Sequence, residues 1–373
     1  MKLLANLGGE EPDAPRTLPE KALAAVLLWT RLFPRGATLL DHVQTPWPDE
    51  LGPEPEDAAF AFLEDADGWA WFNDEGSLQR LRTAGAENPG GADPVAVRAT
   101  HDKAFALRIA REDALDAADL LDAAFALDQE DLAEPAAAAE TIANRVRAWP
   151  QGLARGVLLK PRFGTTGRGQ RRLPLDLPET LPEVLAALSG RGGIVVEPLL
   201  DRIADYSVQL VIESSGDLRL LGCLAQSVSE RGSFLGHEGE IDSRGRVRSG
   251  SRWEETLRER ASAVALRAAA AGYRGPCGVD ALSYRDAQGA ERLRGVVEWN
   301  ARFTMGMVAI GLMRRALRGV RERLALSPGE LRRVRFDASG FDAKGRIDAK
   351  GREVHFRGIA LDLSAHARLE IEA

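Results

Sequence analysis

The chain has 373 residues, of which 45% are hydrophobic and 28% charged, and its formal net charge is −7. This length allows two or three domains of ordinary globular composition. The mixed charge argues against broad nucleic-acid binding, and the longest apolar stretch, residues 22–29, is too short to span a membrane. The only cysteines, Cys223 and Cys277, are expected as core residues, and the histidine spacing fits no zinc or other transition-metal site. The start lacks the pattern of a signal peptide, so we expect a cytoplasmic protein.

Residues 1–97 are expected to form a small α/β unit. A short strand at 3–6 ends in two glycines, and an amphipathic helix follows at 19–32. Further strands are predicted where apolar residues cluster, at 37–40 and 58–63. Beyond this unit, apolar residues recur at helical spacing from 103 to 127, which predicts a helix there.

An apolar strand from Gly156 to Lys160 leads into a glycine-rich loop at 164–169. Glycines let backbone N–H groups approach phosphate oxygens closely. The loop also carries side-chain donors, at Thr165, Thr166 and Arg168. It lacks the Gly-Lys-Ser/Thr of a P-loop and the spaced glycines of a dinucleotide site. Phosphate binding and an ordinary hairpin turn therefore both remain open at this position.

A buried-type strand at 193–200 contains the pair Glu197-Pro198. Its backbone can hydrogen-bond an adenine edge, and the glutamate can hold a ribose hydroxyl, although the segment alone says little. A hairpin is predicted next, with strands at 205–212 and 218–224 around a Ser-Ser-Gly-Asp turn.

A second predicted hairpin, from residue 278 to residue 302, carries two carboxylates and an amide. Glu298 and Asn300 are two residues apart and so point to the same face of a strand. If the hairpin is centred on Gly289, Asp280 lies directly opposite Glu298. Carboxylate and amide oxygens suit Mg²⁺, which water and nucleotide phosphates normally complete. The alternative is a surface hairpin with incidental polar residues.

Residues beyond Ser327-Pro328 alternate in short strand-like runs with glycine turns between them. This pattern predicts a C-terminal β appendage at 327–373, to which the sequence assigns no function.

The order of these segments resembles the ATP-grasp superfamily, of which biotin carboxylase and D-alanine–D-alanine ligase are familiar members. The resemblance covers roughly residues 98–315. It runs through His101-Asp102-Lys103, the Lys160 strand with its glycine loop, Glu197-Pro198, Asp280 and Glu298-Trp299-Asn300-Ala301-Arg302. It implies an α/β (α+β) ATP-grasp fold. The implied domains are an N-terminal α/β domain at 1–97, an ATP-grasp domain at 98–326 with a lid subdomain at about 145–197, and the C-terminal β appendage at 327–373.

The resemblance also implies roles for individual residues. The expected ATP contacts are Lys103, Lys160, Gly164, Thr165, Thr166, Gly167, Arg168, Gly169, Glu197, Pro198, Leu199 and Leu200. Asp280, Glu298 and Asn300 are expected to hold Mg²⁺ or Mn²⁺, although many members have Glu in place of Asp280. Arg302 and Lys160 are expected to act on the transferred phosphoryl group. The segment after the first hairpin matches the border of the acceptor site in this family, which makes Arg231, His237 and Arg248 candidates for substrate contact; an exposed loop is the alternative for each.

Lys160 is expected to lie outside the core, so its replacement by Met is expected to change stability by no more than about 1 kcal/mol.

The function implied by the resemblance is that of a Mg-ATP-dependent ligase. Such an enzyme activates a small-molecule or peptide carboxylate as an acylphosphate, which an amine or thiol then attacks. A kinase-like phosphotransferase and a non-catalytic nucleotide-binding protein are the alternatives. The presence of both lysines and all three oxygen ligands argues against the non-catalytic alternative, whereas the residues do not separate ligase from kinase.

Overall fold

The computed structural model describes residues 1–9, 28–41, 53–164, 167–228, 234–324, 327, 329–338, 358–364 and 367–372. Most of the helix predicted at 19–32 lies outside the described residues, as do Thr165, Thr166 and Arg231. No helix in these described ranges is long and apolar enough to cross a bilayer.

The N-terminal part contains a parallel sheet with the strand order β2-β1-β3, formed by β1 (Lys2–Leu4), β2 (Thr38–Leu40) and β3 (Gly68–Ala70). The strand predicted at 58–63 is wrong, because this stretch leads into the 3₁₀ helix η2 (Ala61–Asp65). Phe62 and Leu63 are adjacent and both buried. In a strand with one face exposed, neighbouring side chains point to opposite faces, so one of the two would be exposed.

Helices connect this part to the rest of the chain: α2 (Glu75–Thr83), α3 (Pro94–His101), α4 (Lys103–Glu112) and α5 (Ala118–Ala123). The single helix predicted at 103–127 is therefore divided in the structure. The chain leaves the helix after Glu112, Ala114 adopts a φ of 49°, and the last residues of the prediction form β4 (Phe125–Leu127).

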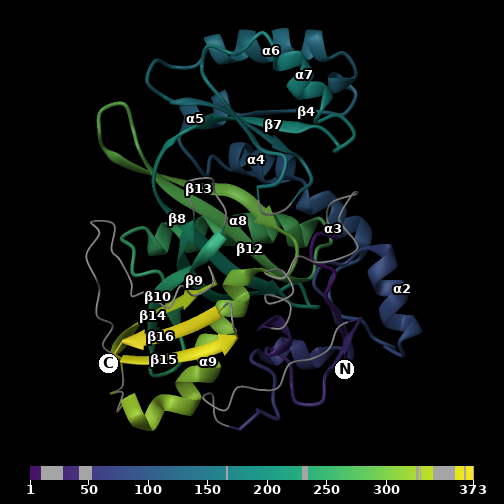
Figure 1. Cartoon of the computed structure of the whole chain (residues 1–373), viewed down its shortest axis with the longest axis vertical. Helices are drawn as coiled ribbons and strands as arrows, with labels where there is room; N and C mark the ends of the chain where they lie inside the picture. Colours follow the sequence, from purple (N-terminus) through teal and green to yellow (C-terminus); the bar gives the residue numbers. More distant parts are fainter. Residues whose placement is uncertain are drawn as a thin grey trace.

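A four-stranded sheet in the order β4-β7-β5-β6 lies at one end of the molecule (Figure 1). Its other strands are β5 (Gly156–Pro161), β6 (Arg171–Leu173) and β7 (Ile194–Leu199). The helices α6 (Pro135–Arg147) and α7 (Leu181–Ala186) pack with it around a separate cluster of buried side chains. This unit begins with β4, before residue 145, where the predicted lid subdomain starts. The assignment of residues 145–197 as a lid subdomain stays a prediction.

The larger sheet has nine strands in the order β13-β12-β8-β9-β11-β10-β14-β16-β15. Its strands are β8 (Asp201–Ile212), β9 (Leu218–Val228), β10 (Phe234–Asp242), β11 (Val247–Arg248), β12 (Gly275–Arg285), β13 (Glu291–Asn300), β14 (Leu331–Asp337), β15 (Gly358–Ser364) and β16 (Ala367–Glu372). The strands of the predicted C-terminal β appendage continue this sheet, because β14 pairs with β10.

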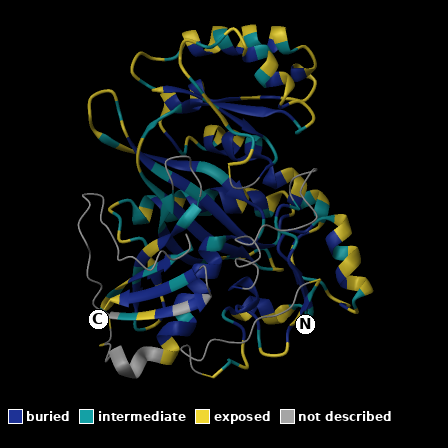
Figure 2. Ribbon diagram, in the orientation of Figure 1, coloured by how far each residue is buried: buried dark blue, intermediate teal, exposed yellow. Residues whose placement is uncertain are grey.

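Two long helices, α8 (Glu254–Ala270) and α9 (Met305–Leu324), cover opposite faces of this sheet. On the α9 face, a Cβ on Gly222 would lie 2.8 Å from Ile310. The next residue, Cys223, points to the other face and interacts with Glu254 at the start of α8. Figure 2 shows the buried residues concentrated along both sheets.

The buried cluster of the smaller sheet supplies a test of the fold. Ile142 in α6 is fully buried in this cluster, so Ile142→Ala should lower the free energy of unfolding by about 2–5 kcal/mol. Val95→Ala is the control, since Val95 is 71% exposed and its truncation should change stability by no more than about 0.5 kcal/mol. If urea denaturation gave equal changes in the free energy of unfolding for the two variants, the packing of Ile142 would be contradicted.

Candidate functional site

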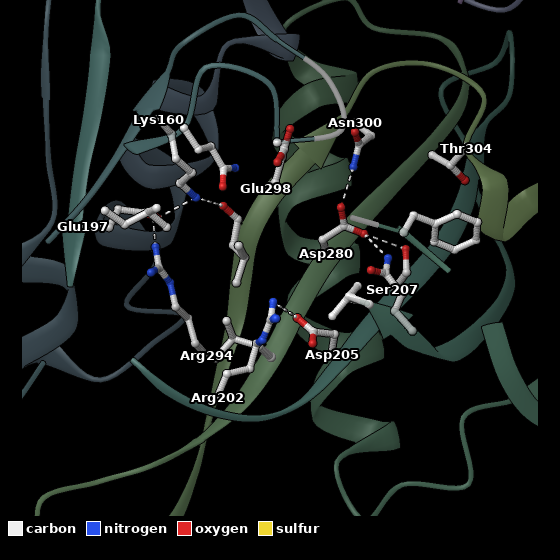
Figure 3. Close-up of a pocket in the computed structure, with 18 of the residues that line it drawn as sticks. Lys160, Glu197, Arg202, Asp205, Ser207, Asp280, Arg294, Glu298, Asn300 and Thr304 are labelled. Carbon is white, nitrogen blue, oxygen red and sulfur yellow. Dashed lines mark hydrogen bonds and ion pairs between the residues drawn. The ribbon is translucent and has the colours of Figure 1, made fainter. Parts of the chain in front are cut away.

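A cavity of about 790 Å³ lies between the four-stranded sheet and the nine-stranded sheet. This volume is within the range of about 300–1,000 Å³ that is typical of ligand pockets. The smaller sheet contributes residues of β5 and β7 and the loop before β6, and the larger sheet contributes β8, β9, β10, β12 and β13. Leu7, Gly8 and Trp71 add a wall from the N-terminal part. Figure 3 shows the charged side chains that gather in this cavity.

The acidic pair of the predicted hairpin is present on β12 and β13. These strands are antiparallel, and Asp280 lies opposite Glu298, which confirms the expected register. Near the turn, pairs such as Tyr284 and Arg292 are centred on position 288 rather than on Gly289. A bulge between Asp280 and Leu282 shifts the pairing and brings the two carboxylates opposite each other.

Asp280 is half-buried and sits in a hydrogen-bond network. Its carboxylate accepts hydrogen bonds from Ser207 Oγ at 2.7 Å, Gln226 Nε2 at 2.9 Å and Asn300 Nδ2 at 3.0 Å. Burial and the negative charge of Glu298 nevertheless raise the pKa of Asp280 to about 6. The pair therefore repels itself, and a cation placed between the two carboxylates would relieve that repulsion.

Lys103 joins this hairpin to the glycine loop. It is the first residue of α4, whose N-cap Asp102 accepts a hydrogen bond from the backbone N–H of Ala104 at 2.9 Å. The Lys103 ammonium lies 3.1 Å from Glu298 Oε1 and donates a hydrogen bond to the carbonyl of Gly164 at 2.9 Å. Lys103 does not line the cavity itself, but it contacts a carboxylate that does.

Lys160 is part of a buried ion network with Glu197 and Arg294. Lys160 Nζ lies 2.6 Å from Glu197 Oε2, and Arg294 pairs with the other carboxylate oxygen. Burial opposes the charge on Glu197, but Arg294 and Lys160 together hold the pKa of this carboxyl below its usual value. Lys160 is only 2% exposed, so the expectation that it lies outside the core is wrong.

The ion network also bears on the ribose contact expected from Glu197. Lys160 and Arg294 already bind both oxygens of this carboxylate. The contact between Glu197 and a ribose hydroxyl therefore stays a prediction. Asp205, which the sequence prediction missed, also lines the cavity and lies 3.3 Å from Arg202.

The glycine loop and the Glu197-Pro198 segment lie on the side of the cavity formed by the smaller sheet. Gly167 and Gly169 have φ angles of 74° and 77°, a conformation that favours glycine. The cavity residues from these two segments are Gly167, Arg168, Glu197, Pro198, Leu199 and Leu200. Leu158 and Leu282 add apolar surface next to them.

The three substrate candidates have different positions. Arg231 lies outside the described residues. His237 on β10 is 1% exposed and lines the cavity, whereas Arg248 on β11 is exposed and is not among the cavity residues. Arg302 lines the cavity, and its Nη1 donates a hydrogen bond to the Phe303 carbonyl at 2.9 Å.

A chain of buried polar groups that the sequence prediction missed links Asp280 to α9. Ser207, which binds Asp280, accepts a hydrogen bond from Gln209 Nε2 at 2.6 Å. Thr304 Oγ1 donates to Gln209 Oε1 and accepts from the backbone N–H of Met307 at 3.1 Å. Ser207 and Gln209 are two apart on a strand, which places them on one face, but only the β8–β12 pairing shows that they reach the acidic pair.

The donor set fits a hard divalent cation. Asp280, Glu298 and Asn300 all line the cavity, and their oxygens are the ligands that Mg²⁺ prefers. Within the described ranges, no group of three or more His, Cys, Asp or Glu side chains could hold a metal ion. A metal at this pair would therefore need water or phosphate oxygens to complete its coordination.

No protein-family model matches the chain, and no curated protein matches it in sequence. Among solved structures, the biotin carboxylase domain of 2-oxoglutarate carboxylase from Hydrogenobacter thermophilus, in complex with MgADP and bicarbonate, is similar over 100% of this chain and 86% of its own, with 15% identity and a TM-score of 0.51. N5-carboxyaminoimidazole synthase from Aspergillus clavatus, in complex with ADP, is similar over 100% of this chain and 94% of its own, with 14% identity and a TM-score of 0.50. The chain has the ATP-grasp fold.

The overlap with another ATP-grasp structure is partial. Biotin carboxylase from Campylobacter jejuni matches 76% of this chain at 18% identity and a TM-score of 0.47, and this chain spans 62% of its length. At such identities the likeness extends to the fold alone, so activity has to be argued from the residues of the cavity.

The buried ion network yields a prediction about stability. Lys160→Met leaves Glu197 buried with one cation fewer, so it should destabilise the fold by about 3 kcal/mol, more than expected for a surface lysine. Glu197→Gln leaves both Lys160 and Arg294 buried without their anion and should cost at least as much. Adding Lys160→Met to Glu197→Gln should restore part of that loss, because one of the two unpaired cations is gone. Urea denaturation of both single variants and the double variant tests this, and strictly additive losses would contradict the coupling.

The raised pKa of Asp280 predicts a pH dependence. Because the folded protein binds this proton more tightly than the ordinary value of 3.8 would give, stability falls as pH rises from about 4 to about 6. In Mg²⁺-free buffer, Asp280→Asn should therefore gain about 1–3 kcal/mol relative to wild type between pH 4 and pH 8. Stability curves of the two proteins that ran parallel over this range would contradict the assignment.

Proposed function

We propose that the cavity binds Mg-ATP and that the chain is an ATP-dependent carboxylate–amine or carboxylate–thiol ligase. The observation that carries the proposal is the opposed pair Asp280 and Glu298, which faces a cavity with cationic side chains on its walls. Lys103 pairs with Glu298 alone, so a metal cation between the two carboxylates would further reduce their repulsion. The oxygens of Asn300 and of nucleotide phosphates would complete the shell of Mg²⁺ or Mn²⁺.

The phosphates would lie between the glycine loop and the acidic hairpin. Gly167 and Arg168 line this part of the cavity, where backbone N–H groups and a guanidinium suit phosphate oxygens. Lys160 lines it too, and Lys103 lies beside Glu298. On binding, Mg²⁺ would neutralise negative charge on the terminal phosphates.

The adenine would lie against the strand that ends at Leu199. Pro198, Leu199 and Leu200 line the cavity there together with Leu158 and Leu282, and apolar side chains of this kind suit the two faces of a purine. Since Lys160 and Arg294 already bind Glu197, we assign the ribose hydroxyls to Asp205 in addition to Glu197.

The proposed reaction has two steps. First, an oxygen of the substrate carboxylate attacks the γ-phosphorus, the bond to the β–γ bridging oxygen breaks, and ADP leaves with that oxygen. An amine or thiol then attacks the acyl carbon of the acylphosphate and displaces inorganic phosphate, losing a proton in the process. Cationic side chains such as Lys160 and Arg302 would stabilise the charge on the transferred group, and no side-chain nucleophile is required.

Product analysis tests the reaction. Incubation with Mg-ATP, pooled small carboxylates and hydroxylamine in place of the amine should give ADP and a hydroxamate. AMP and pyrophosphate would contradict the mechanism, because they require attack at the α-phosphorus. ADP with a stable phosphorylated product and no hydroxamate would instead identify a kinase-like phosphotransferase.

Glu298→Gln tests the metal site within this reaction. The substitution keeps the shape but removes one anionic ligand, so Mg²⁺-dependent ADP release should fall by at least about 100-fold. The matched control is Glu291→Gln on the same strand, because Glu291 pairs with Arg252 and does not line the cavity. Unchanged turnover in folded Glu298→Gln at saturating Mg²⁺ would remove Glu298 from the site.

A further inference from the structure

The end of the cavity beyond the acidic pair differs in chemistry from the proposed nucleotide side. Leu7, Gly8 and Trp71 reach it from the N-terminal part. They follow the carboxyl ends of the parallel strands β1 and β3, where ligands bind in open α/β sheets. Asn6 ties the two strand ends together, since its side chain donates to the Phe72 carbonyl at 2.7 Å and accepts from the Phe72 N–H at 3.1 Å.

The opposite walls of this end also carry apolar side chains, next to the polar residues Gln226 and Thr304. Val228 on β9 and Phe234 on β10 line it from the larger sheet, and Met305 lines it from the start of α9. Trp71 is held against an aromatic cluster, with its ring 6.2 Å from that of Phe303 and 5.9 Å from that of Trp29. Trp71, Val228, Phe234 and Met305 together form what we call the apolar cup.

Among the described cavity residues, two near Phe234 and Met305 carry groups that commonly bear positive charge, His237 and Arg302. His237 faces the cavity side of the sheet, because it lies opposite Gln226, whose side chain reaches Asp280. Burial lowers the pKa of His237 to about 3, against a hydrogen bond to the backbone of Ala225 that acts in the opposite direction. The imidazole is therefore neutral near pH 7, and Arg302 supplies the positive charge.

We propose that the carboxylic acid taken by this site has an apolar body without an ammonium group, seated against Trp71, Phe234 and Met305, with its carboxylate directed to Arg302. This inference rests on the proposed function and narrows its substrate class. The apolar walls would bind the body by removing hydrocarbon surface from water, and the neutral His237 adds no charge that an apolar body would have to desolvate.

The charges of the cavity also argue against an α-amino acid. A buried ammonium needs an anionic partner, and the described carboxylate next to this end is Asp280, which Gln226 contacts from the position opposite His237. The nearest acidic residues have other partners, since Asp280 and Glu298 form the proposed metal pair and Asp205 pairs with Arg202. The cup thus favours a carboxylate alone over a zwitterion.

Three probe acids test the substrate class on the full chain. 3-Phenylpropanoate has the apolar body, phenylalanine adds an ammonium group to the same skeleton, and succinate replaces the apolar body with a second carboxylate. Their affinities are measured by titration calorimetry, both with and without MgADP. We expect 3-phenylpropanoate to bind at least about tenfold more tightly than either of the others. Equal or weaker binding of 3-phenylpropanoate, or no binding of it at all, would overturn the inference.

A variant pair locates the bound acid. Met305→Glu places a carboxylate in the cup and should weaken 3-phenylpropanoate binding at least about tenfold through charge repulsion and desolvation. Met305→Gln has almost the same shape without the charge and should weaken it much less. Thermal unfolding of both variants checks the fold, and wild-type affinity in a folded Met305→Glu would contradict the placement.

The outcomes separate this inference from the proposed function. A chain that binds no MgADP contradicts the proposed function, while the ranking of the three acids without nucleotide still decides the class of ligand. If the chain binds MgADP but prefers phenylalanine or succinate, the proposed function stands and the inference of an apolar substrate is contradicted.

Discussion

Two half-buried carboxylates held opposite each other on the wall of the cavity are the constraint around which this site is arranged. The β12–β13 register brings Asp280 and Glu298 together, and burial together with the charge of Glu298 disfavours ionisation of Asp280. Distant segments supply the compensation. Lys103 reaches Glu298 from the start of α4, and Ser207 donates to Asp280 from the neighbouring strand. The fold therefore holds two carboxylates whose mutual repulsion a divalent cation would reduce.

Parts of this arrangement could be predicted from the sequence because they depend on local rules. Strand alternation places Glu298 and Asn300 on one face, and the turn residues between the strands set the approximate pairing of Asp280. The order of the lysine strand, the glycine loop and the acidic hairpin was enough to predict the ATP-grasp fold. The hairpin of β8 and β9 is likewise confirmed.

Other parts depend on tertiary contacts that no single segment encodes. The burial of Lys160 arises from Glu197 and Arg294, which lie on two different sheets. The link from Asp280 through Ser207 and Gln209 to Thr304 requires the pairing of β8 with β12 and the docking of α9. The apolar run at 58–63 predicts a strand but forms part of a 3₁₀ helix, because clustering of apolar residues does not distinguish a strand from a buried 3₁₀ turn.

The central claim, that this acidic pair is a metal site completed by nucleotide phosphates, is tested most directly by electron paramagnetic resonance of Mn²⁺. Titration of the chain with Mn²⁺ should show weak binding alone and much tighter binding when ADP is present, since phosphate oxygens would complete the shell. Asp280→Ala should abolish the nucleotide-dependent gain. The claim would be contradicted if the Mn²⁺ affinity did not depend on ADP. It would also be contradicted if ADP still increased the Mn²⁺ affinity of a folded Asp280→Ala chain.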